Sequence, residues 1–97
     1  MNSQLGRTLQ EARTSLTPGE VLSAAKSFFG PRNAAYAAFV EREGPSHLVL
    51  RGQGGEEVVI ATRTVAGVTN VSGSSYLFDQ QVARFLASLA PAGESAA

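Results

Sequence analysis

Three short apolar runs in the middle of the chain most constrain its fold. The runs cover 35–43, 47–51 and 56–63, and the turn segments Gly44-Pro45-Ser46 and Gly52-Gln53-Gly54-Gly55 separate them. Short apolar runs bounded by glycine and proline are typical of antiparallel strands joined by tight turns. Val65, Val68 and Val71 supply material for a fourth strand, although their spacing fits a two-residue period poorly. We therefore predict a three- to four-stranded antiparallel β-meander over 34–73.

A helix start precedes these strands. In the segment Leu16-Thr17-Pro18-Gly19-Glu20-Val21, Thr17 fits the N-cap, Pro18 fits the first helical position and Glu20 can return its carboxylate to the cap backbone. Gly30-Pro31 then supplies a stop signal. These signals predict a helix over 18–29.

A second helix is predicted after the strands. Ser74-Ser75 offers an N-cap, and Asp79 falls in the first turn, where a carboxylate complements the helix dipole. The apolar residues of this segment share one helical face; they are Phe78, Val82, Phe85, Leu86 and Leu89. The pattern predicts a helix over 76–89.

Together these elements predict a single small α+β domain, with the meander flanked by an N-terminal and a C-terminal amphipathic helix. We expect the domain to cover 17–90. Residues 1–16 carry only a thin stripe of apolar residues and are expected to be an N-terminal arm, either flexible or helical on binding a partner. Residues 91–97 are expected to be a disordered tail.

Composition narrows the function classes. The 97 residues suffice for one core, and the absence of cysteine excludes disulfides and thiolate metal sites. Eight Lys+Arg balance eight Asp+Glu, which argues against a binder of long nucleic acid, because such affinity needs a surplus of cations. The longest apolar run, 34–40, is too short to span a membrane, and the start of the chain lacks the apolar stretch of a secretory signal, so we expect a cytoplasmic protein.

The sheet faces suggest an interface. If the turns centre near Gly44-Pro45 and Gln53-Gly54, Val40 lies opposite Val49, Val49 lies opposite Val58, and Arg51 lies beside Glu56. Two helices cover one face of such a sheet, so the other face, with its apolar centre, is expected to meet a partner. The interface residues predicted on this basis are Tyr36, Val40, Val49, Val58 and Ile60, with Leu5 and Leu9 of the arm as a second contact. The competing arrangements place one helix on each face, or fold the arm over the gap.

The sequence contains little catalytic chemistry. His47 is the single histidine, and no serine or carboxylate is placed against it by the expected register, which puts it near Arg42 and Ile60. Glu41 and Glu43 point the same way on a strand but lie near a hairpin end, where charged residues commonly face water. We predict no catalytic residue, no metal ligand and no cofactor.

The leading hypothesis is therefore a non-catalytic protein-interaction module or accessory subunit, either a homodimer or a chain that docks on a protein partner. The alternative is a binder of single-stranded nucleic acid or of a small anionic ligand through Arg42, Arg51 and Arg63. An enzyme ranks third and would need a pocket around His47 with Glu41 or Glu43.

Overall fold

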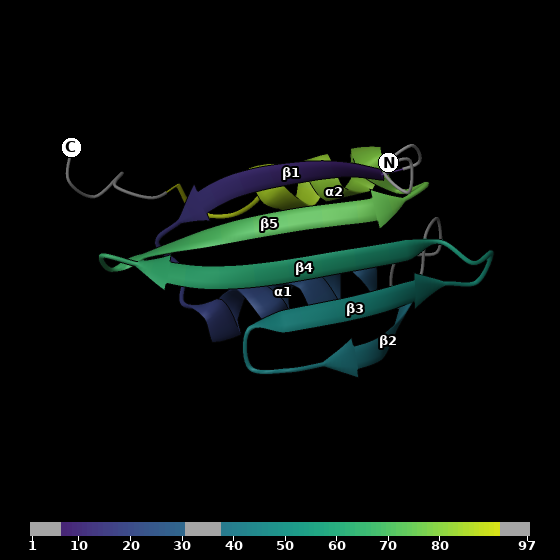
Figure 1. The fold of residues 1–97 in the computed structure, drawn as a ribbon, viewed down its shortest axis with the longest axis horizontal. Coiled ribbons are helices and arrows are strands. Elements are labelled where there is room, and N and C mark those ends of the chain that lie inside the picture. Colours follow the sequence, from purple (N-terminus) through teal and green to yellow (C-terminus); the bar gives the residue numbers. More distant parts are fainter. Residues whose placement is uncertain (1–6, 31–37, 92–97) are drawn as a thin grey trace.

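The computed structural model describes residues 7–30 and 38–91, which form one sheet and two helices (Figure 1). In chain order the elements are β1 (Arg7–Thr14), α1 (Pro18–Phe29), β2 (Ala38–Glu43), β3 (His47–Gly52), β4 (Glu57–Val65), β5 (Val68–Tyr76) and α2 (Asp79–Ala87). The α+β class and the antiparallel sheet are confirmed. The expected strand count is wrong, because the sheet has five strands.

The fifth strand comes from the N-terminal segment. The strand order is β1-β5-β4-β3-β2, so β2 to β5 form a meander and β1 adds to its far edge (Figure 1). Residues 7–14 therefore form a strand where the apolar stripe indicated a flexible or helical arm. The register pairs Leu9 with Ser74 and Thr14 with Thr69. Residues 1–6 and 92–97 of the expected arm and tail lie outside the described residues, whereas Pro91 forms a bridge with Thr14.

A tight turn explains the poor period of the expected fourth strand. Val65 ends β4 and Val68 begins β5, and the two residues pair across the turn. Ala66 and Gly67 between them have φ angles of 53° and 80°, the left-handed values that a two-residue hairpin turn requires. The three valines were expected to share one strand, but they belong to two.

The first helix forms as predicted, from Pro18 to Phe29. The backbone N–H of Glu20 donates to the Thr17 hydroxyl oxygen at 3.2 Å, and the N–H of Thr17 donates to the Glu20 carboxylate at 2.8 Å. This reciprocal pair satisfies two N–H groups that a helix start leaves without partners. Local sequence therefore defines the start of α1.

The second helix begins later than expected. Ser74 and Ser75 lie in β5 rather than at a helix cap, and Leu77 has a φ of 78° that turns the chain off the sheet before α2 begins. The Ser75 hydroxyl still contributes to the helix start, because it donates to Oδ1 of Asp79 at 2.9 Å. The helix is therefore shorter than the predicted 76–89.

The hairpin between β3 and β4 shifts the sheet register by one residue from the expected one. Gly55 adopts a φ of 92°, and the Gly52 N–H donates to the Glu56 carbonyl oxygen at 2.9 Å across a loop that holds one residue more than expected. Leu50 therefore pairs with Val58, Val49 pairs with Val59, and Arg51 lies opposite Glu57 rather than Glu56. A one-residue shift moves a strand's side chains to the other face.

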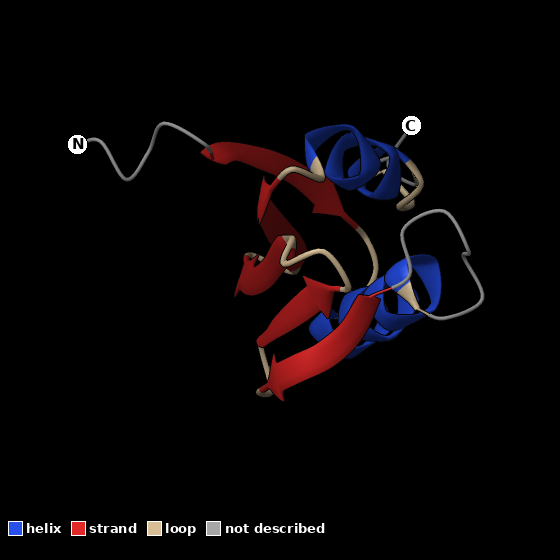
Figure 2. Cartoon of the chain, turned by 90° about the vertical axis from the view of Figure 1, so that its right-hand side faces the viewer, coloured by secondary structure: helices blue, strands red, loops and turns tan. Residues whose placement is uncertain are grey.

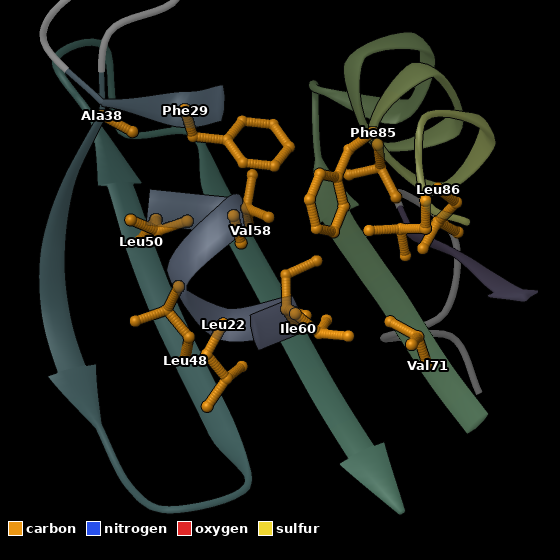
Figure 3. Packing of buried hydrophobic residues seen from close by; sticks show 14 residues of the cluster. Leu22, Phe29, Ala38, Leu48, Leu50, Val58, Ile60, Val71, Phe85 and Leu86 are labelled. Carbon is orange, nitrogen blue, oxygen red and sulfur yellow. The ribbon is translucent and has the colours of Figure 1, made fainter. Parts of the chain in front are cut away.

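Both helices lie on the same side of the sheet (Figure 2). Helix α2 contacts β1 and β5, and α1 contacts β2, β3 and β4. They meet through aromatic rings: Phe85 of α2 lies 5.6 Å from Phe28 and 5.7 Å from Phe29 of α1, between ring centroids. Figure 3 shows Phe29 and Phe85 together with Val58 and Ile60 of the sheet. The arrangement with one helix on each face is therefore excluded.

Candidate functional site

The sheet face away from the helices, which we call the open face, is covered by no described element (Figure 2). Along β4, the buried residues Val58, Ile60 and Thr62 alternate with less buried ones. The same alternation runs along β5. The open-face residues in β1, β5, β4 and β3 are Leu9, Glu11, Arg13, Asn70, Ser72, Ser74, Tyr76, Glu57, Val59, Ala61, Arg63, His47, Val49 and Arg51.

Two valines, Val49 and Val59, form a short apolar strip at the centre of this face, in a row that continues with Arg42 on one side and with Ser74 and Leu9 on the other. Val49 and Val59 are cross-strand partners and are half-buried although no helix covers them. Larger apolar side chains stand toward the margins: Leu9 is 65% exposed, Phe39 56% and Tyr76 47%. Phe39 and Tyr76 belong to the neighbouring row, in which Arg51 and Glu57 lie between them, so the apolar strip is small and is uncovered.

One end of the open face carries a cluster of ion pairs. The Arg51 guanidinium lies 2.9 Å from a carboxylate oxygen of Glu41 and 3.4 Å from one of Glu57. Arg51 thus has acidic neighbours on both sides and is poorly placed to bind an anion.

The other end holds a trough with a net positive charge. Arg13, Asn70 and Arg63 are consecutive cross-strand partners on β1, β5 and β4. They stand with Glu11 around a cavity of about 490 Å³, over small residues that include Ala61 and Ser72. Neither arginine forms an ion pair with another described residue.

The predicted interface residues are not brought together. Val58 and Ile60 are 1% and 0% exposed in the core, because the register shift turns them toward the helices, so their assignment to the uncovered face is corrected. Val49 lies on the open face, and Leu9 joins it there through β1. Val40 pairs with Leu50 on the helix-covered side. Tyr36 and Leu5 lie outside the described residues.

The three arginines of the alternative hypothesis are also separated. Arg51 lies between two carboxylates at one end of the open face, Arg63 lines the trough at the opposite end, and Arg42 stands beside a bulge in the edge strand β2. Sequence reasoning missed Arg13 because residues 7–14 lack the apolar alternation of a strand. The sequence holds only a weak indication of this strand: Leu9, Glu11 and Arg13 are spaced two residues apart, but they are not consistently more apolar or more polar than the residues between them.

The carboxylate pair of the enzyme hypothesis is split. A bulge between Val40 and Arg42 breaks the expected alternation. Glu41 therefore binds Arg51 on the open face, whereas Glu43 binds Lys26 of α1 at 2.8 Å. His47 pairs with Ala61, not Ile60. Within 7–30 and 38–91, no three potential metal ligands among His, Asp and Glu cluster together, and no helix is both long and apolar enough to cross a membrane.

Comparisons of the chain with protein-family models, with curated proteins and with solved structures found no match. The features of the chain that bear on function are therefore those of the open face: its apolar strip and the trough lined by Arg13 and Arg63.

Proposed function

We propose that this protein is a non-catalytic interaction module that self-associates through its open face. The observation that carries the proposal is the apolar strip around Val49 and Val59, which remains uncovered while both helices pack on the other side. Antiparallel sheets commonly present a polar face to water, so an apolar centre on the solvent side favours a partner.

The size of the face suits a second copy of the chain. Five strands spaced about 4.8 Å apart make a sheet roughly 24 Å wide, and a nine-residue strand such as β4 is about 30 Å long. Allowing for the shorter strands, the open face offers roughly 600 Å² per copy. A dimer would bury roughly 1,200 Å², the lower limit of stable specific interfaces. We therefore expect a reversible dimer that depends on concentration.

Replacing Val59 with lysine is expected to abolish the dimer. The ammonium group would lie at the centre of the apolar strip, where association would remove it from water without a partner. Light scattering over a concentration series should give a dimer for the unmodified chain and a monomer for Val59→Lys, with unchanged circular dichroism.

The matched control is Val40→Lys. Val40 is 41% exposed and belongs to the helix-covered side of the sheet, so the same change of residue there should leave the dimer intact. A monomer for the unmodified chain at every concentration, or equal association by Val59→Lys, would refute self-association through this face.

The second candidate is binding of a single strand or a small anion in the trough. It is supported by Arg13 and Arg63, which face the cavity without ion pairs among the described residues. The nearby Glu11 and the acidic neighbours of Arg51 weaken it, because they limit the positive field along the sheet. Salt-dependent binding of a labelled oligonucleotide by an unmodified monomer would favour this function over dimerisation.

A further inference from the structure

We infer that the trough binds a small sugar phosphate, with the phosphate group held between Arg13 and Arg63. The inference rests on the second candidate function, anion binding in the trough, and names the class of ligand. Arg13, Asn70 and Arg63 face the same side of three adjacent strands, β1, β5 and β4 (Figure 1). Two strand spacings therefore separate the Cα atoms of the arginines, a distance of about 10 Å, and Asn70 lies between them.

A phosphate monoester suits this pair of cations. Each guanidinium can donate two parallel hydrogen bonds to a phosphate, and an organic phosphate offers three acceptor oxygens and a charge of about −1.5 to −2. A carboxylate, with two oxygens and one charge, would use fewer of these donors. Arg13 and Arg63 are exposed and form no ion pair with another described residue, so a phosphate would displace no such pair.

The surroundings of the two arginines favour a small ligand over a nucleic-acid strand. Among the described residues that line the trough, none is an aromatic residue on which a base could stack. Tyr76 is on the same strand as Asn70 but lies about 20 Å farther along β5. Arg51, which a longer anion would also need, is already bound to two carboxylates. The trough therefore suits one phosphate group.

Polar groups beside the arginines suit the hydroxyl groups of a sugar. Glu11 precedes Arg13 by two residues on the same side of β1, and it pairs with Ser72 of β5. Both side chains can accept hydrogen bonds from hydroxyl groups, whereas the Glu11 carboxylate would repel a second anionic group. Ser72 and Ala61 are small, and the cavity of about 490 Å³ above them is within the usual size of small-molecule sites. A ligand with one phosphate and several hydroxyls therefore matches the whole trough.

An NMR titration of the isotope-labelled full chain tests the inference, with glucose 6-phosphate as the sugar phosphate and with inorganic phosphate and glucose for comparison. We expect the sugar phosphate to shift the amide signals of Asn70 and Ser72 to saturation. It should bind about fivefold more tightly than inorganic phosphate, because its hydroxyls add a hydrogen bond. Glucose should cause no shift. Arg13→Gln and Arg63→Gln should each weaken binding of the sugar phosphate by at least about tenfold, whereas Arg84→Gln on the exposed side of α2 should leave it unchanged.

Glu11→Ala separates the sugar contact from the phosphate contact. The variant removes a negative charge near the phosphate, so inorganic phosphate should bind more tightly, while the advantage of the sugar phosphate should be lost. Equal affinity of the unmodified chain for the two phosphates would overturn the sugar assignment and leave anion binding intact. Tighter binding of oligothymidylate at the same amides would overturn it in favour of a strand. No shift with any of these anions would refute both the inference and anion binding, without affecting self-association, which light scattering measures separately.

Discussion

Replacing Phe85 with alanine is expected to destabilise the fold by about 3–5 kcal/mol. Its side chain is fully buried, and its ring lies 5.6 Å and 5.7 Å from the rings of Phe28 and Phe29, measured between centroids. These contacts join α2 to α1 above the sheet (Figure 3). The substitution therefore removes apolar contact from both helices and leaves a cavity between them. Denaturant unfolding followed by circular dichroism measures the loss.

Two further variants make this result specific. Phe85→Leu keeps most of the buried volume and should be affected less than Phe85→Ala, which provides a measurement if the alanine variant fails to fold. Leu77→Ala removes a large apolar side chain that is 63% exposed, and it should change stability far less. If Phe85→Ala and Leu77→Ala cost the same, the aromatic contact does not hold the helices together.

Replacing Gly73 with valine is expected to cost about 3 kcal/mol, through overpacking rather than through a cavity. Gly73 lies in β5 under α2, and a Cβ at this position would lie 2.8 Å from Cγ1 of Val82 and 3.3 Å from Cδ1 of Ile60. Both neighbours are fully buried and β-branched, so they have little freedom to move. Helix α2 would have to move away from the sheet, and the thermal midpoint should fall accordingly.

Gly19→Ala is the control for this substitution. Gly19 lies in the first turn of α1, and a Cβ there would meet no atom within 4 Å. Alanine also favours the helix over glycine by about 1 kcal/mol, so this variant should be as stable as the unmodified chain or slightly more stable. A Gly73→Val variant with an unchanged midpoint would show that α2 does not press on β5 at this point.

The length of the β3–β4 turn decides which residues of β4 lie on each face of the sheet. The expected register placed Val58 beside Val49 and therefore on the uncovered face. In the structure Gly55, with its left-handed φ, belongs to the loop, which is therefore one residue longer than expected. As a result Val58 and Ile60 point into the core and Val59 lies on the open face. Of the interface residues predicted from the sequence, Val49 lies on the open face, whereas Val58 and Ile60 lie in the core, because the segment 58–61 is apolar throughout and its pattern does not distinguish the two faces.

The trough is a second feature that the sequence did not predict, because it depends on contacts between segments far apart in the chain. The sequence predicts Arg63 as an anion-binding candidate from its place on a strand, but nothing in the sequence points to Arg13. The two arginines are brought near each other only because β1 pairs with β5, and that pairing joins segments more than fifty residues apart in the chain. Residues 7–14 carry no apolar alternation that would indicate a strand, so the pairing had no local signal.

The sequence alone determined those features that depend on neighbouring residues. The Thr17 and Glu20 cap defines the start of α1, and the glycine-containing turns place β2, β3 and β4 in an antiparallel meander, because these interactions span only a few positions. Only the tertiary structure decided that β1 joins the sheet, that both helices cover one face, and that Val49 and Val59 remain open at the centre of the other. These outcomes depend on strand register and on packing between distant segments, where a single added turn residue exchanges the two faces of a strand.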